Sequence, residues 1–344
     1  MRFVSFNYID RFARAGVLLG ASVIDLSAAA ALVYEGQEGA RWELLDMLRG
    51  APEGMGLDGA VDIASAVLDQ LGFDDANDFG ASEAGAGRRG HNMAVPISIG
   101  GVEMLLPLDE VRLVAPLPRP PSLRDFYAFE QHVATASRNR GRDVPPAWYE
   151  LPVFYFGNHS AIYGPNADVP IPRTTALDYE LEIACVIGRA GRDIAEEDAA
   201  EYIAGYTIMN DWSARDLQRE EMSVGLGPAK GKDFATSLGP WLVTPDELEL
   251  FALADGRFNL SMIARVNGVE RSRGNFRDIY YTFAQMIARA SRDAALYPGD
   301  VLGSGTVGSG CLLEQTAGQG PWLAEGDEVE LEISGLGILR NQIG

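Results

Sequence analysis

Glu180 and Glu182 lie two positions apart in residues 177–183, where apolar and acidic residues alternate strictly. Because successive side chains of a β-strand point to opposite faces, this pattern places both carboxylates on one face and the apolar residues on the other. A half-buried strand with a solvated acidic face has the same pattern. The chemical alternative is a pair of hard oxygen ligands whose mutual repulsion is relieved by a divalent cation.

Asp211 supplies a further carboxylate, after a predicted strand that ends near Met209 and at the start of a predicted helix. On that helix Asp211, Arg215 and Gln218 have the spacing i, i+4 and i+7, which places them on one face. A helix N-cap with an ion pair to Arg215 explains Asp211 without any chemistry. That interpretation gives Gln218 no role, so a chemically active helix face is the alternative.

Asp125 and His132 follow the same logic, because they are two turns apart on one face if their segment is helical. The carboxylate could then reach a metal ion while the imidazole holds a water molecule. A single histidine beside aromatic residues is more often a packed, hydrogen-bonded residue. The residues alone leave both interpretations open.

Four segments, in this order, resemble the signature blocks of the fumarylacetoacetate hydrolase family. They are Asp125-Phe126-Tyr127 with His132, residues 178–182, residues 210–216 with Gln218, and Gly231-Lys232-Asp233-Phe234. The resemblance extends over about residues 116–340, whereas residues 1–115 are only loosely similar to the small N-terminal domain of bacterial members. It implies a β-rich α+β fold of the mixed β-sandwich roll type, usually assembled as a homodimer.

The resemblance also implies a metal centre and the residues around it. The expected cation is Mg2+, or else Ca2+ or Mn2+, and oxygen-only ligands suit these hard cations on independent grounds. The positions that match the family's metal ligands are Asp125, Glu180, Glu182 and Asp211. His132 would activate water, oriented by a glutamate that Glu314 matches. The positions that match substrate or oxyanion contacts are Tyr127, Tyr155, Arg215, Gln218, Lys232 and Thr306.

Three arginines after His132 are placed to clamp a remote carboxylate of an oxo-acid substrate. They are Arg138, Arg140 and Arg142. We predict Arg142 as the substrate-binding residue, although the sequence does not distinguish it from the other two. Together with Trp148 and Tyr149, this stretch is suited to form a lid.

The resulting hypothesis is a metal-dependent hydrolase that cleaves a carbon–carbon bond in a 1,3-diketo acid, such as fumarylacetoacetate or an acylpyruvate, in the catabolism of aromatic or related compounds. The alternative is a decarboxylase, isomerase or hydratase that acts on 2-oxo acids through the same metal–enolate chemistry. His132 and Glu314 favour hydrolysis. A non-catalytic binding protein is a further alternative, against which His132 and Lys232 argue because both are retained beside every expected ligand.

The elements that must position these residues divide the chain near a run of four prolines within residues 116–121, which suits an extended connector. We predict a small N-terminal α+β domain over 1–115 and a metal-binding catalytic domain over 116–344. Strands do not alternate regularly with helices, which favours a β-rich α+β domain. The strands are predicted at 15–19, 22–26, 102–106, 151–156, 177–188, 205–209, 241–244, 261–266, 301, 311–314 and 329–333. The helices are predicted at 41–49, 60–71, 196–204 and 276–292, and from about 123 and 212, while 74–90 is expected to be an exposed loop.

The amino-acid composition makes some classes of binding partner unlikely. The chain has 344 residues, with 28 basic and 49 acidic side chains and a formal net charge of −21, so it would repel nucleic acids and anionic membrane surfaces. Its two cysteines, Cys185 and Cys311, lie in apolar runs, which predicts buried thiols in a reducing compartment. No apolar stretch approaches the length of a membrane span, and we expect a cytoplasmic protein.

Overall fold

The computed structural model describes residues 1–52, 54–72, 96–139 and 141–344. The loop predicted over 74–90 and the candidate residue Arg140 lie outside these ranges. Within them, strands outnumber helices and form several sheets, so the predicted β-rich α+β class is confirmed. None of the helices in the described ranges is long and apolar enough to cross a membrane.

One large sheet carries most of the strands that matter for the site. Its members in spatial order are β4 (Ile97–Ile99), β5 (Val102–Pro107), β3 (Ser22–Asp25), β2 (Arg14–Leu19), β1 (Arg2–Asn7), β15 (Thr236–Val243), β13 (Ile203–Asp211), β12 (Leu181–Ile187), β18 (Val301–Gly303), β7 (Leu123–Phe126) and β8 (Phe154–Phe156). Two further strands pair at its side, β6 (Arg112–Val114) with β1 and β9 (Ile162–Tyr163) with β15. The sheet is mixed, because β18–β7 and β15–β9 are parallel pairs among antiparallel ones.

Two smaller sheets complete the strand framework. The five-stranded sheet has the order β10 (Asp168–Val169), β20 (Gly337–Ile343), β19 (Glu328–Ile333), β16 (Ser261–Val266) and β17 (Val269–Asn275). The two-stranded sheet pairs β11 (Leu177–Asp178) with β14 (Ser213–Ala214). This short pairing brings the segments before Glu180 and after Asp211 together, so it helps to position the site.

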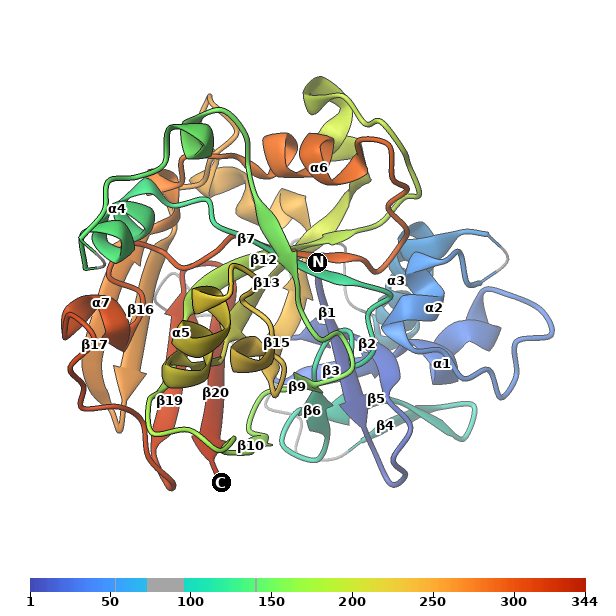
Figure 1. The fold of residues 1–344 in the computed structure, drawn as a ribbon. Helices are drawn as coiled ribbons and strands as arrows, with labels where there is room; N and C mark the ends of the chain where they lie inside the picture. The colour runs from blue at the N-terminus through green and yellow to red at the C-terminus, as the bar shows by residue number, and fades with distance from the viewer. Residues whose placement is uncertain (53, 73–95, 140) are drawn as a thin grey trace.

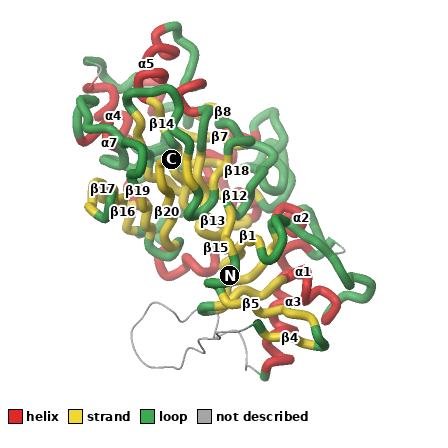
Figure 2. Tube along the Cα trace, turned by 90° about the horizontal axis from the view of Figure 1, so that it is seen from below, coloured by secondary structure: helices red, strands yellow, loops and turns green. Residues whose placement is uncertain are grey.

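Most of the helices form two groups on opposite sides of the molecule (Figure 1). They are α1 (Leu26–Ala29), α2 (Leu44–Leu48), α3 (Gly56–Leu71), α4 (Glu130–Asn139), α5 (Arg215–Ser223), α6 (Phe283–Ser291) and α7 (Leu312–Gln315). Short 3-10 turns also occur, among them η4 (Glu196–Tyr202), η5 (Lys230–Lys232) and η7 (Phe276–Asp278). Figure 1 shows α1, α2 and α3 on the side of the blue N-terminal strands, α4, α5 and α7 on the other side, and α6 between these groups. In Figure 2 the same separation runs along the long axis of the chain.

Both faces of the central strands are buried, which explains their nearly continuous apolar sequence. On β12, Ile183 and Cys185 face one core, whereas Ala184 and Val186 face the other. The first core is shared with α6 and the five-stranded sheet, and the second with α1, α2 and α3. The sequence of a strand that is covered on both faces is a continuous apolar run, without alternation of apolar and polar residues.

The N-terminal segment is joined to the rest of the chain through the large sheet. β1 pairs with β15, with Arg2 opposite Val243 and Phe3 opposite Leu242. Strands from both sides of residue 115 therefore belong to one hydrogen-bonded array. The division of the chain into two domains at residue 115 stays a prediction from the sequence.

The helix predicted from about residue 123 is wrong over its first half. Residues 123–126 form β7, which pairs with β18 on one side and β8 on the other, and the helix α4 begins only at Glu130. Pairing with two distant strands satisfies this backbone, a contribution that local propensity does not include. Asp125 therefore lies on a strand, and its spacing to His132 is not that of a helix face.

The helix predicted from about residue 212 also begins later, and the strand at 311–314 is wrong. β13 continues to Asp211, β14 follows, and α5 starts at Arg215 with Ala214 as its N-cap residue. Residues 312–315 form the short helix α7, while the predicted helix over 276–292 is reduced to η7 and α6. In each case the error concerns short segments whose ends are set by tertiary contacts.

Candidate metal centre and active site

The four predicted metal ligands lie side by side because neighbouring strands carry them. Asp125 is on β7, Glu182 on β12 and Asp211 at the end of β13, while Glu180 directly precedes β12. All four side chains are buried, and one carboxylate oxygen from each lies within 4.8 Å of the others. The structure thus assembles the set from three separated segments, although the N-cap role considered for Asp211 is wrong.

Crowding of these carboxylates shifts their acidity. Burial, and then a neighbouring carboxylate, raises the pKa of Asp125 well above its ordinary value. Burial raises the pKa of Glu182 in the same way, with Asp125 and Glu180 adding to the effect. Glu180 behaves differently, since the raising effect of burial is exceeded by Arg215 and Lys232 and its pKa falls below the ordinary value. Like charges in a dry site resist ionisation unless a cation accompanies them.

One ammonium group enters the carboxylate cluster. Lys232, at the end of η5, forms ion pairs with Glu180 and Asp211. Burial lowers the pKa of this ammonium group, but the two carboxylates outweigh burial and hold the pKa above its ordinary value. Lys232 and Arg215 together offset only part of the negative charge of the four carboxylates and Asp178, so the charge balance of the cluster favours binding of a further cation.

The donor set fits a hard divalent cation such as Mg2+, Ca2+ or Mn2+. Every donor in the cluster is a carboxylate oxygen, the ligand type that these ions prefer. The N–H of Gly305 donates to Asp125 and to Glu182, each at 3.1 Å. The hydroxyl of Tyr155 donates to Asp211 at 2.5 Å. Such contacts behind the ligands fix the orientation of the oxygens.

Gly305 is required at its position for a steric reason. Its φ is 76°, and a Cβ added there would lie 2.4 Å from the carbonyl oxygen of Phe126. Only glycine therefore brings this N–H to the two carboxylates. The next residue, Thr306, donates its hydroxyl to Glu182 at 3.3 Å.

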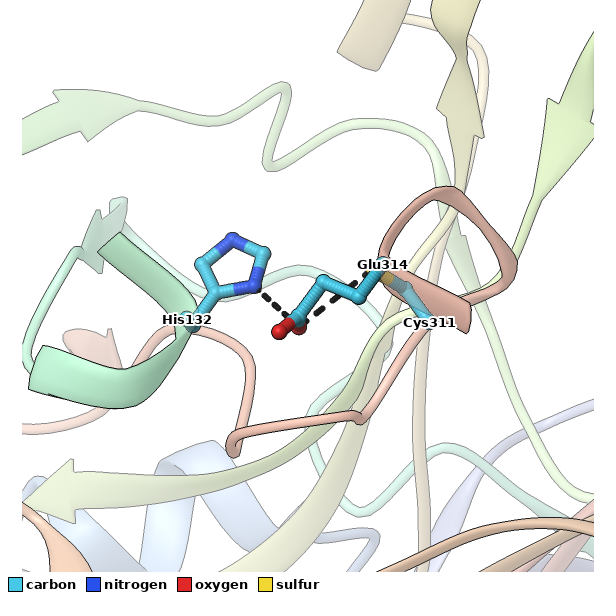
Figure 3. A group of neighbouring side chains, drawn as sticks. All are labelled: His132, Cys311 and Glu314. Carbon is cyan, nitrogen blue, oxygen red and sulfur yellow. Dashed lines mark hydrogen bonds and ion pairs between the residues drawn. The ribbon is translucent and has the colours of Figure 1, made fainter. Parts of the chain in front are cut away.

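His132 and Glu314 form a hydrogen-bonded pair, which Figure 3 shows together with Cys311. Nδ1 of His132 on α4 lies 2.5 Å from Oε1 of Glu314 on α7, and the backbone N–H of Ser309 donates to the second oxygen at 3.2 Å. Cys311 contacts the same carboxylate through Sγ at 3.7 Å. A carboxylate at Nδ1 favours the tautomer with its proton there, which leaves Nε2 as a proton acceptor.

The N-cap interpretation predicted an ion pair between Arg215 and Asp211, but Arg215 has other partners. Its Nε donates to Asp178 at 2.8 Å, one terminal nitrogen donates to Glu180 at 2.8 Å, and the other donates to Gln218 at 3.1 Å. The guanidinium group therefore reaches across from α5 to the two-stranded sheet. Gln218 remains on the same helix face as Arg215, as the spacing predicted.

Asp178 is a site residue to which the sequence interpretation gave no role. It is fully buried and also accepts the backbone N–H groups of Leu312 at 2.8 Å and Leu313 at 3.0 Å. One carboxylate thus holds both Arg215 and the start of the helix that carries Glu314. The signal available in the sequence was its place on the acidic face shared with Glu180.

A pocket of about 300 Å³ opens onto this arrangement. The predicted residues that line it are Asp125, Tyr127, His132, Tyr155, Glu180, Glu182, Arg215, Gln218, Lys232 and Thr306. Arg142 does not: it is exposed, as is Arg138, and neither is among the lining residues. The structure therefore brings no arginine from this stretch to the pocket within the described residues. Asp211 and Glu314 lie directly behind the lining residues through their contacts with Tyr155 and His132.

Comparison with known proteins identifies the class. Residues 122–344 match the family model described as "Fumarylacetoacetate (FAA) hydrolase C-terminal", which is more than half of the chain. The chain belongs to the fumarylacetoacetate hydrolase family.

Individual relatives differ in the reactions that their names state. The chain is 33% identical to a fumarylacetoacetase of Arabidopsis thaliana over 265 residues, which cover 60% of this chain and 63% of the relative. It is also 33% identical to a mitochondrial oxaloacetate tautomerase of Homo sapiens over 243 residues, covering 70% of this chain and 71% of that protein. The chain thus spans less than two thirds of the fumarylacetoacetase.

A solved structure confirms the fold over the whole length. The maleylpyruvate hydrolase of Sphingobium sp. SYK-6, solved in complex with manganese(II) ion and pyruvate, superposes with a TM-score of 0.65. The superposition covers all of this chain and 98% of that one at 24% sequence identity. At this identity the similarity establishes the fold alone, which includes the N-terminal segment.

Proposed function

We propose that this chain is a metal-dependent hydrolase that cleaves a carbon–carbon bond in a 1,3-diketo acid. The observation that carries the proposal is the His132–Glu314 pair, whose free imidazole nitrogen belongs to a residue lining the same pocket as the carboxylate cluster. A metal centre alone suits several reactions of oxo acids. A histidine oriented by a buried carboxylate adds what hydrolysis requires, namely a base for water.

We further propose that Asp125, Glu180, Glu182 and Asp211 hold Mg2+, Ca2+ or Mn2+. A cation held there would supply Lewis acidity and a template for the two oxygens of the oxo acid. The oxygen-only donor set supports this assignment, as does the manganese(II) bound by the maleylpyruvate hydrolase that shares the fold.

The side chains of this chain then account for the movement of protons and charge. Nε2 of His132 takes a proton from water, and the hydroxide adds to the acyl carbonyl carbon. The bond between this carbon and the neighbouring methylene breaks, and its electron pair passes to the pyruvate half. The former methylene carbon, now part of the pyruvate half, takes a proton from the imidazolium of His132, giving a carboxylic acid and a 2-oxo acid. Arg215 and Lys232 face the negative charge that develops.

Tautomerisation of a 2-oxo acid is the second candidate, since the oxaloacetate tautomerase relative is as similar as the fumarylacetoacetase. It needs proton transfer at carbon but no attack by water. A product mixture identified by NMR distinguishes the reactions. Two fragments indicate hydrolysis, carbon dioxide indicates decarboxylation, and an unchanged mass indicates isomerisation.

The decisive variant is His132→Ala, assayed with an acylpyruvate and Mg2+. We expect turnover to fall by about 100- to 10,000-fold, the usual contribution of a general base, while cation binding measured by thermal shift is retained. His159→Ala is the matched control, because His159 is exposed and lies outside this pocket. Undiminished cleavage by the His132 variant would exclude the proposed role of this residue.

We propose that the enzyme acts as a homodimer in the cytoplasm on small oxo acids from the catabolism of aromatic or related compounds. Family resemblance supports the dimer, and the net charge of −21 supports a small-molecule rather than a nucleic-acid partner.

A further inference from the structure

The lining of the pocket changes from charged to apolar along two helices. On α5, Arg215, Gln218 and Met222 all line the pocket with the spacing i, i+3 and i+7. At 1.5 Å per residue, Met222 lies about 10 Å from Arg215 along the helix axis. On α4, His132 is followed one turn later by Ala136, about 6 Å further along. Both helices thus present chemistry at one end and an apolar side chain at the other.

Other segments continue the apolar part of the lining. Val153 directly precedes β8 and Phe154 is its first residue, while Pro228 comes from the loop after α5 and Leu313 from α7. None of these side chains carries a charge or a hydrogen-bonding group. They add apolar surface to the pocket onto which the carboxylate cluster opens.

The cationic groups of the pocket are already paired. Arg215 contacts Asp178 and Glu180, and Lys232 contacts Glu180 and Asp211. No other lysine or arginine lines the pocket within the described ranges. A second carboxylate on the remote end of a substrate would therefore face methyl, methylene and aromatic groups without a counter-ion, which is costly when water is excluded.

We propose that this site selects 2-oxo acids whose remote end is an uncharged hydrocarbon chain and discriminates against those that end in a second carboxylate. The inference rests on the proposed function for the nature of the reacting end. Apolar contact favours a longer chain, and the formal charge of −21 disfavours a dianion as it approaches.

The first experiment compares two substrates of equal length. Butanoylpyruvate (2,4-dioxoheptanoate) ends in a methyl group, and succinylpyruvate (2,4-dioxoheptanedioate) ends in a carboxylate. With Mg2+-loaded enzyme we expect kcat/KM to be at least tenfold higher for butanoylpyruvate and to rise roughly two- to fourfold for each further methylene that the pocket covers. Equal kcat/KM values, or a preference for the diacid, would overturn the proposal.

The second experiment tests whether one substitution in the pocket shifts the substrate preference toward the dicarboxylate. Met222→Arg places a guanidinium group at the apolar end, where the native side chain is 38% exposed. We expect kcat/KM for succinylpyruvate to rise at least tenfold and that for butanoylpyruvate to fall. Val224→Arg adds the same charge two residues later on an 81% exposed side chain outside the pocket, and should leave both values unchanged. Equal effects of the two substitutions would show that the local lining does not set the preference.

If neither compound is cleaved, the preference for an apolar remote end is tested by measuring ligand binding. In that case the proposed hydrolysis fails, and the uncleavable pair 2-oxohexanoate and 2-oxoadipate is compared by thermal shift with Mg2+ present. A larger shift with 2-oxohexanoate supports the apolar preference independently of the reaction. A shift with 2-oxoadipate that is as large or larger overturns it.

Discussion

Glu182→Gln tests the carboxylate cluster because its effect should change sign when a cation is added. Glutamine keeps the size of the side chain and one oxygen that can accept from the N–H of Gly305, while its amide nitrogen takes the place of the oxygen that Thr306 contacts. It removes one of four negative charges from a buried cluster. The same substitution should therefore weaken cation binding and relieve repulsion in the metal-free protein.

The stabilisation that a bound cation gives the folded protein follows from its concentration relative to its Kd. A divalent cation at 100 times its Kd stabilises the folded state by about 2.7 kcal/mol. Unfolding entropy for 344 residues is about 0.7 kcal/mol/K, so the midpoint of wild type should rise by about 4 °C. If the loss of one ligand weakens binding about 100-fold, the same cation concentration adds only about 0.4 kcal/mol, or less than about 1 °C.

The metal-free side follows from the pKa of Glu182, which burial and neighbouring carboxylates raise well above its ordinary value. A raised carboxyl pKa in the folded state costs nothing below the pKa of the unfolded chain, and the cost grows as the pH rises above that value. At neutral pH the metal-free wild type bears this cost and the glutamine variant does not. The metal-free variant should therefore melt at or above the wild-type midpoint.

The assay is thermal unfolding of EDTA-treated protein with and without Mg2+, Ca2+ or Mn2+. Glu325→Gln is the matched control, because Glu325 is exposed and is not a member of the cluster. It should keep the full cation-induced shift. A wild-type protein that shows no shift with any of the three cations, or a Glu182→Gln variant that shifts as much as wild type, would refute the proposed ligand set.

Three further predictions concern contacts around the site. Asp178→Asn removes the charge that holds Arg215 and the start of α7, so the free energy of unfolding in urea should fall by about 3–5 kcal/mol. Tyr155→Phe removes the hydroxyl that donates to Asp211, so calorimetry should show divalent-cation affinity lowered by about 10- to 100-fold with the fold retained. At Asp216 burial raises the pKa, but hydrogen bonds from threonine hydroxyls and backbone N–H groups outweigh it and lower the pKa to about 2. Since this lies below the value in the unfolded chain, the stabilisation is complete above about pH 4 and is lost toward pH 2; Asp216→Asn should cost about 1–2 kcal/mol at neutral pH and much less in acid.

Each of these predictions has a clear contrary result. An Asp178→Asn variant as stable as wild type would mean that the buried carboxylate is dispensable to α5 and α7. Unchanged cation affinity in Tyr155→Phe would separate the hydroxyl from the metal centre. A stability difference between wild type and Asp216→Asn that does not vary with pH would show that the ionised carboxylate is not its source.

The nature of the site was predictable because it depends on residue types and short spacings. Alternation in residues 177–183 correctly placed Leu177, Tyr179, Leu181 and Ile183 in the core, and the acidic residues on the other side. Buried free thiols were likewise predicted for both cysteines. These inferences need only the period of a strand and the hydrophobicity of its side chains, which are local properties.

The ion-pair partners of side chains and the pairing of strands were less predictable, since both depend on contacts between distant segments. The spacing of Asp211 and Arg215 suggested a local ion pair, yet Arg215 binds Asp178 and Glu180, which lie 37 and 35 positions away. Segment 123–126 carries no strand signal of its own and becomes a strand by pairing with β18 and β8. Sheet pairing and the neutralisation of buried charges depend on contacts between distant segments, which local propensities do not include.

The sequence by itself determined the chemical character of the site: a set of carboxylates, a histidine and a lysine, with oxygen donors of the type that hard divalent cations prefer. Only the tertiary structure decided how these groups cooperate. It gave Asp178 its role between α5 and α7, left Arg142 outside the pocket and lined the pocket with apolar side chains beyond Arg215 and His132. The physical reason is that ligand chemistry belongs to single residues, whereas the surroundings of a site arise from sheet register and packing among segments far apart in the chain.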